Sequence, residues 1–139
     1  MNILVIDGQG GQLGSQLIKT IRNKYSDIHI IAVGTNATAT ASMMKAGANQ
    51  GATGENPVIV ASRKADMIIG PIGIVIADAL LGEITPKMAV AIGQSNATKI
   101  HIPINKCENL VAGVQNLTTT ALIEDTLKKI QETIDKKCF

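Results

Sequence analysis

Hydrophobic residues in this chain form short unbroken runs that alternate with longer stretches in which they recur every three to four positions. Unbroken apolar runs are typical of strands that are buried on both faces, as in a parallel sheet. Recurrence at three to four positions is typical of amphipathic helices. The pattern therefore predicts strands at 3–6, 28–33, 66–69 and 99–104, with shorter candidates at 48–53 and 110–114.

Helices are expected between these strands, and several have recognisable ends. Thr35 or Asn36 can cap a helix over 37–46, and Gly47 ends it. Asn56 followed by Pro57 predicts a helix that begins there and runs to about residue 65. Further helices are expected at 13–22, 74–81, 86–94 and 119–137. The alternation predicts one α/β domain, residues 1–139, around a mostly parallel sheet of five to six strands.

A glycine-rich turn follows the first strand directly: Asp7-Gly8-Gln9-Gly10-Gly11-Gln12-Leu13-Gly14. Glycine lets a ligand approach the backbone closely, and the N-terminus of the next helix favours an anion. The turn therefore predicts a phosphate-bearing ligand. Its glycine spacing departs from Gly-x-Gly-x-x-Gly, and there is no Gly-Lys-Ser/Thr of a P-loop. The alternative is a turn that only lets strand and helix pack closely.

Two further loops follow predicted strands: Gly34-Thr35-Asn36 and Gly54-Glu55-Asn56. In a parallel sheet such loops emerge at the same carboxyl edge, so we expect both near the ligand. Thr35 and Asn36 can hydrogen-bond a ribose or a phosphate, whereas Glu55 is either a solvated charge or a site carboxylate. Neither an acid nor an arginine follows Val33, which predicts weak discrimination between a 2′-OH and a 2′-phosphate unless a distant residue enters the site.

Candidate catalytic groups are few. Asp7, Glu55, Asp78 and Cys107 are the residues that an enzyme could use. Asp7 stands where strand meets turn, so it either orients a ribose or a phosphate-bound Mg²⁺ or accepts hydrogen bonds from the turn itself. The sequence contains no recognisable catalytic dyad, triad or metal cluster. We therefore name no catalytic residue, reaction or metal, and whether the protein is an enzyme stays open.

Composition narrows the function classes. Hydrophobic residues make up 45% of the chain and charged residues 17%, which favours a folded core. A net charge of +2 and only two aromatic residues, Tyr25 and Phe139, argue against nucleic-acid binding. The apolar run over 67–77 is too short to span a membrane. Two cysteines without a pairing pattern, and no signal peptide, predict a cytoplasmic protein.

Residues 72–81 predict self-association. Their only charge is Asp78, so a helix over this stretch would be apolar nearly all round. A domain of this size has little protein of its own to cover such a helix, which predicts a homo-oligomer, most simply a homodimer. The alternative is that the helix over 86–94 covers it.

Several motifs together resemble those of an uncharacterised family of small bacterial proteins known only as a domain of unknown function. They are Asp7-Gly8-Gln9-Gly10-Gly11, Gly34-Thr35-Asn36, Ala46-Gly47-Ala48-Asn49, Gly51-Ala52-Thr53-Gly54-Glu55-Asn56 and Gly70-Pro71-Ile72-Gly73. The resemblance implies a bacterial cytosolic protein and no particular reaction.

At the level of fold alone, the chain is also similar to the Rossmann group of dinucleotide-binding domains, which implies a three-layer Rossmann-like domain. The function expected is binding of a nucleotide or dinucleotide, NAD(P) or another, at the glycine-rich loops. The alternatives are an enzyme subunit whose substrate site is completed by a partner chain, and a structural subunit without a ligand.

Overall fold

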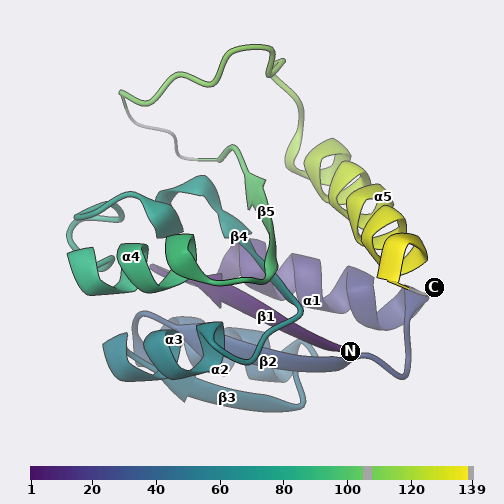
Figure 1. The fold of residues 1–139 in the computed structure, drawn as a ribbon, viewed down its shortest axis with the longest axis horizontal. Coiled ribbons are helices and arrows are strands. Elements are labelled where there is room, and N and C mark those ends of the chain that lie inside the picture. The colour runs from purple at the N-terminus through teal and green to yellow at the C-terminus, as the bar shows by residue number, and fades with distance from the viewer. Residues whose placement is uncertain (105–107, 138–139) are drawn as a thin grey trace.

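The computed structural model describes residues 1–104 and 108–137 and has a five-stranded, all-parallel sheet at its centre (Figure 1). Its strands lie in the order β3-β2-β1-β4-β5. They are β1 (Asn2–Asp7), β2 (His29–Gly34), β3 (Gln50–Thr53), β4 (Met67–Pro71) and β5 (Thr98–Ile102). The expected α/β class with a parallel sheet is confirmed.

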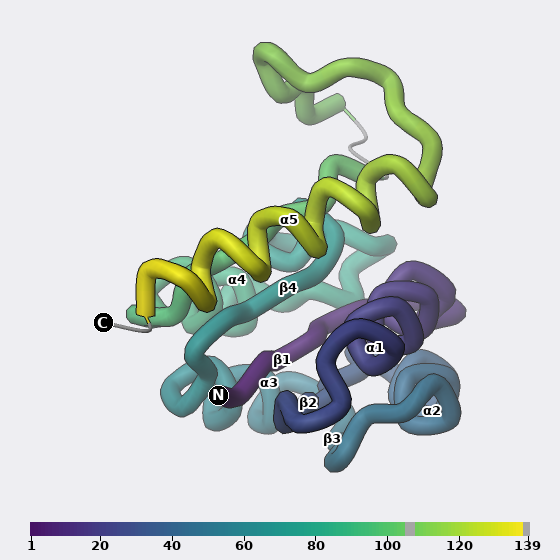
Figure 2. Tube along the Cα trace, turned by 90° about the vertical axis from the view of Figure 1, so that its right-hand side faces the viewer, coloured from purple at the N-terminus to yellow at the C-terminus, as the bar shows by residue number. Residues whose placement is uncertain are grey.

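Helices cover both faces of the sheet. One face carries α1 (Gln12–Lys24), α2 (Ala37–Lys45) and α5 (Thr119–Lys137). The other carries α3 (Glu55–Ser62), the 3₁₀ turn η1 (Ile72–Val75) and α4 (Pro86–Gln94). Figure 2 shows α1 and α5 in front of the strands, with α3 and α4 behind them. From β1 the next strands, β2 and β3, are added on one side, whereas β4 and β5 are added on the other side. The topological switch point therefore lies between β1 and β4.

The central strand β1 explains the unbroken apolar run. Ile3 and Val5 belong to the core beneath α1, α2 and α5, whereas Leu4 and Ile6 belong to the core beneath α3 and α4. All four are at most 1% exposed. A strand in the middle of a three-layer fold has no solvent side, so its sequence shows no polar alternation.

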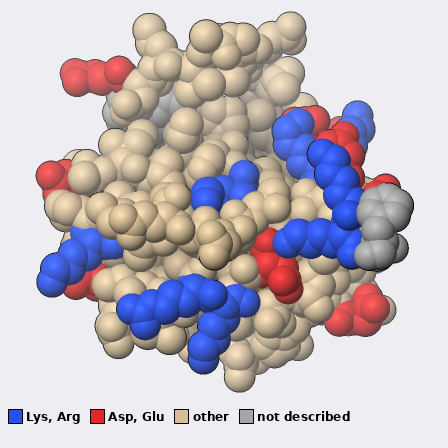
Figure 3. All heavy atoms as spheres, in the orientation of Figure 1, with Lys and Arg blue, Asp and Glu red and all other residues tan. Residues whose placement is uncertain are grey.

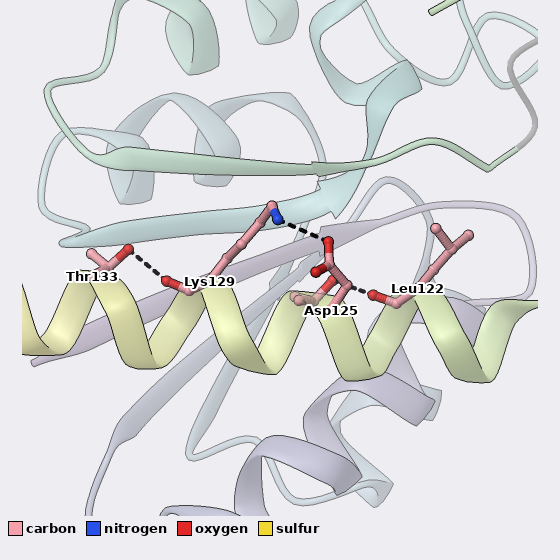
Figure 4. Close-up of polar contacts among 5 residues, drawn as sticks. Leu122, Asp125, Lys129 and Thr133 are labelled. Atoms are coloured by element: carbon pink, nitrogen blue, oxygen red, sulfur yellow. Dashed lines mark hydrogen bonds and ion pairs between the residues drawn. The ribbon is translucent and has the colours of Figure 1, made fainter. Parts of the chain in front are cut away.

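Helix α5 returns to the sheet after a long connection. Described residues of this connection, 103–104 and 108–118, arch away from the body in both views (Figures 1 and 2). Residues 110–114 are mostly exposed and form no strand, so the candidate sixth strand is wrong. Ile123 and Ile130 of α5 are buried on the sheet. Its outer side is polar, with the Asp125–Lys129 ion pair at 2.8 Å (Figure 4).

The helix expected over 74–81 is also wrong. After η1 the chain forms a compact turn in which Asp78, Leu80 and Leu81 have left-handed φ angles of 66°, 57° and 56°. This stretch is apolar because Ile74 is buried and its neighbours pack against the α3–α4 core, not because it is a helix. The premise of the predicted self-association, an apolar helix, is therefore absent.

The helix expected to begin at Pro57, with Asn56 as its N-cap, begins two residues earlier. Gly54, with φ 105°, is the N-cap of α3, and Asn56 and Pro57 lie in the first turn. Proline is tolerated there because the N–H groups of a first turn have no partner within the helix.

The surface has no large charged field on the side seen in Figure 3. Lysine and arginine side chains gather at the right and across the lower part of this view, acidic side chains lie near several of them, and much of the remaining face is formed by uncharged residues. Among the described residues, no helix is long and apolar enough to cross a membrane.

Candidate functional site

A cleft of about 380 Å³ opens over the glycine-rich turn at the carboxyl end of β1. It lies at the switch point, where α/β sheets usually bind their ligands. Its walls come from both halves of the sheet and from the start of α5. The lining residues are 7–13, Gln16, Pro71, Leu80, Ile104 and Thr119.

The glycines of the turn have different reasons to be glycine. Gly11 is the N-cap of α1 at φ 72°, and a Cβ there would lie 2.8 Å from the Ala39 backbone of α2. A Cβ on Gly14 would lie 2.6 Å from Met43 Sδ, and one on Gly8 would lie 2.6 Å from Thr35 Oγ1. These three glycines serve close packing, the alternative that the sequence left open.

Gly10 differs from the other three glycines. A Cβ there would have its nearest neighbour, Gln12 Cγ, at 3.9 Å, and its φ is not left-handed. Packing therefore gives no reason for glycine at this position. Gly10 lines the cleft, where a missing side chain leaves room for a ligand against the backbone.

Unpaired N–H groups accompany Gly10. No hydrogen bond among the described residues uses the backbone N–H of Gly10, Gln12 or Leu13. The last two belong to the first turn of α1, whose N–H groups and dipole carry partial positive charge. The turn thus presents donors at the cleft without a protein acceptor.

Asp7 is occupied by the turn itself. Its Oδ1 accepts from the Gly8 N–H and its Oδ2 from the Gly14 N–H, both at 2.8 Å, and the residue is 6% exposed. Burial raises the pKa of the Asp7 carboxyl, the two hydrogen bonds oppose this, and the charge of Glu83 adds to the rise. Of the two roles considered, the structure shows the one in which Asp7 ties strand to helix.

Glu83 is the residue that the sequence reasoning missed. Its Oε1 accepts from Thr35 Oγ1 and from Asn36 Nδ2, each at 2.6 Å. The Gln9 N–H lies 3.1 Å from Oε1 and 3.2 Å from Oε2. No motif marks this position, which lies between the stretches 74–81 and 86–94 that were expected to be helices. Glu83 is 74 residues from Gln9 in the chain, so only the fold brings them together.

These hydrogen bonds also set the protonation state of Glu83. Partial burial acts to raise its pKa, but the bonds from Thr35, Asn36 and Gln9 outweigh burial and lower the pKa of the carboxyl. The site therefore holds a charged carboxylate beside the glycine turn at neutral pH.

Thr35 and Asn36 lie beside the glycine turn, as expected. The Thr35 N–H donates to Asp7 O at 3.0 Å, and Asn36 Nδ2 donates to Gln9 O at 2.9 Å. Asn36 Oδ1 accepts from the Ala39 N–H, so its predicted capping of α2 is confirmed. Their polar side-chain atoms are largely committed to Glu83 and to this cap.

Gly54, Glu55 and Asn56 lie apart from the cleft, although they are at the same edge of the sheet. None of the three lines it. Glu55 Oε2 accepts from Thr85 Oγ1 at 2.5 Å, and Thr85 is the N-cap of α4. The structure thus joins this loop to the α3–α4 layer rather than to the glycine turn.

The other candidates do not complete a catalytic group. Asp78 is exposed and does not line the cleft. Cys107 lies outside the described residues. Burial and the nearby Lys99 lower the pKa of His101, whose Nδ1 is buried without a hydrogen-bond partner in the described part of the chain. Within residues 1–104 and 108–137, no three histidine, cysteine or acidic residues gather as metal ligands. The arrangement can bind an anion and accept hydroxyl donors.

Comparison with known proteins identifies the family. The chain belongs to the family described as "Domain of unknown function (DUF3842)", whose model matches residues 2–135. No curated protein matches it. Among solved structures, it is similar to a dodecameric FMN-dependent UbiX-like decarboxylase from Escherichia coli O157:H7, with 14% identity and a TM-score of 0.47. The match covers 96% of this chain and 76% of that one.

Proposed function

We propose that this member of a family of unknown function binds a nucleotide or dinucleotide, with a phosphate group against the backbone of Gly10, Gln12 and Leu13. One observation carries the proposal: Gly10 has no packing reason to be glycine and lines the cleft beside unpaired N–H groups. Backbone donors at a helix N-terminus form charge-assisted hydrogen bonds with phosphate oxygens.

The size of the cleft supports a small ligand. About 380 Å³ falls at the lower end of the range for small-molecule sites, so part of a dinucleotide would extend beyond the cleft. NAD(P) is one member of this ligand class, along with other phosphate-bearing nucleotides. Among the described residues, no group of side chains in the cleft supports catalysis by this chain alone. If the protein is an enzyme, a partner chain supplies the missing chemistry.

Calorimetric titration with ADP, ADP-ribose, NAD and NADP tests the proposal. At least one should bind saturably with one site per chain. Gly10→Val should weaken binding by about 1–3 kcal/mol, the size of a lost charge-assisted hydrogen bond plus a steric clash. Because a Cβ at Gly10 meets only the flexible Gln12 side chain, at 3.9 Å, the variant should fold normally. Gly93→Val is the control, since a Cβ there has no neighbour within 4 Å and Gly93 does not line the cleft. Unchanged affinity in folded Gly10→Val would reject this site.

Self-association as a homodimer is the second part of the proposal, with a new supporting observation. Leu81 is 96% exposed in the turn that also contributes Leu80 to the cleft wall. An exposed leucine held in a left-handed conformation buries no surface of its own chain, so contact with a second copy would account for it. Sedimentation equilibrium of the wild type and of Leu81→Lys tests this. A monomer at micromolar concentration in the wild type would reject the dimer.

A further inference from the structure

The turn that presents Glu83 is held in place by its own hydrogen bonds. The Asp78 N–H donates to Ile84 O at 2.8 Å, and the Ile84 N–H donates back to Ala79 O at 3.2 Å. Ile84 is fully buried and anchors the turn in the α3–α4 core. Left-handed φ angles at three non-glycine residues persist only where the surroundings over-determine the backbone. These bonds place the Glu83 carboxylate beside Gln9, which lines the cleft, whereas Glu83 itself is not among the residues that line it.

The carboxylate stands at the end of β2, beside the glycine turn. Thr35 and Asn36 directly follow β2 and both donate to Oε1. In α/β nucleotide sites, a ribose hydroxyl is bound at this place by an acid that follows the strand in sequence. No acid follows Val33 in this chain. Instead, the turn before α4, on the other side of the switch point, supplies the acid Glu83.

The two oxygens of Glu83 differ in what they can still accept. Oε1 receives three donors, Thr35, Asn36 and the Gln9 N–H. Among the residues that the structure describes, Oε2 receives only the Gln9 N–H, which it shares with Oε1, at 3.2 Å. A carboxylate oxygen can accept about two hydrogen bonds. Oε2 therefore keeps capacity for a further donor, and an ionised carboxylate accepts bonds only.

We infer that Glu83 is a specificity-determining residue that accepts a hydrogen bond from a free ribose hydroxyl of the ligand and rejects a phosphate at that position. The inference rests on the proposed function, because it assumes a nucleotide whose phosphate lies at Gly10. Weak discrimination between 2′-OH and 2′-phosphate ligands was expected unless a distant residue enters the site. With Glu83 as that residue, we instead expect a preference for the 2′-OH ligand. The ligand class is a nucleotide or dinucleotide with an unmodified ribose diol.

The test compares ADP-ribose with 2′-phospho-ADP-ribose by calorimetry in the wild type, Glu83→Gln and Asp78→Asn. The wild type should prefer ADP-ribose by roughly thirtyfold or more, and Glu83→Gln should reduce the preference to about threefold or less. Glutamine retains an oxygen for Thr35, so the turn should stay folded. Asp78→Asn removes an exposed carboxylate of the same turn and should keep the wild-type preference.

Two results would overturn the inference while leaving the proposed function intact. One is equal affinity of the wild type for both ligands. The other is that Glu83→Gln raises the affinity for both ligands by the same factor. This is expected if the carboxylate only occupies hydrogen-bond donors that a phosphate of the ligand needs. If wild-type protein binds neither these ligands nor ADP, the proposed function itself fails, and the inference fails with it.

Discussion

Substitution of Gly11 and Gly10 by alanine should separate the two kinds of glycine in the turn. At Gly11 the left-handed φ of 72° costs an ordinary residue about 1 kcal/mol. The new Cβ would also lie 2.8 Å from Ala39 Cα and 2.9 Å from Ala39 O, which are backbone atoms of a buried helix turn. Relieving that contact requires α2 to shift, at a cost of about 1–3 kcal/mol. The expected loss for Gly11→Ala is roughly 2–4 kcal/mol.

Gly10→Ala should behave oppositely. Its Cβ meets only the flexible side chain of Gln12 at 3.9 Å, and alanine restricts the unfolded chain more than glycine does. We expect a change within about 0.5 kcal/mol of wild-type stability. Urea denaturation followed by circular dichroism measures both variants, and the Gly11→Ala midpoint should fall while the m-value is unchanged. Equal losses in the two variants would refute the assignment of Gly10 to the ligand and Gly11 to packing.

Three further predictions concern the groups around the turn. Hydrogen bonds lower the pKa of Glu83 below 4.5 against the effect of burial, so the unfolded state binds more protons just below that pH. Wild-type stability should therefore lose the contribution of Glu83 as pH falls below about 4.5, and Glu83→Gln should remove that part of the pH dependence in urea titrations. A Glu83→Gln curve of stability against pH that runs parallel to the wild-type curve would contradict this role of Glu83. Asp7 behaves in the opposite way, because burial raises the pKa of its carboxyl, so the contribution of Asp7 to stability declines as pH rises above 3.8. Asn36→Ala removes the cap of α2 and a donor to Glu83, which should cost about 1–2 kcal/mol in thermal or urea unfolding; a neutral effect would mean that the cap is replaced. Leu81→Lys should leave the unfolding midpoint of the monomer unchanged, because Leu81 is exposed, and should halve the mass seen by sedimentation.

The sequence was sufficient for the architecture because the buried strands and most helices leave strong local patterns. The run Ile3 to Ile6 predicts a central strand, and both faces of it are indeed buried. Asn36 predicts the start of α2 because capping is a local interaction. Local patterns gave wrong predictions where the buried residues do not recur at a regular spacing. Residues 72–81 are apolar because their turn packs on a core, and periodicity alone cannot tell such a turn from a buried helix.

The site was only partly predictable, for the same reason. The turn Asp7 to Gly14 and its neighbours Thr35 and Asn36 follow strands that are adjacent in the sheet, so the expectation that they meet needed only the strand order. Gly54 to Asn56 follow the edge strand β3, and Glu55 accepts a hydrogen bond from Thr85 instead. Glu83 reaches the site through a turn whose left-handed backbone at leucine no sequence rule predicts. Its contacts depend on tertiary packing of Ile84, which lies outside any local pattern.

Backbone amide shifts during titration with ADP test the central claim most directly, because they report where a phosphate lies. In a ¹⁵N-labelled sample, the N–H signals of Gly10, Gln12 and Leu13 should move downfield and saturate together, as expected for bonds to phosphate oxygens. The Gly93 signal should stay in place, since this residue lies outside the cleft. Saturable binding that moves other signals while these three remain unchanged would contradict the account.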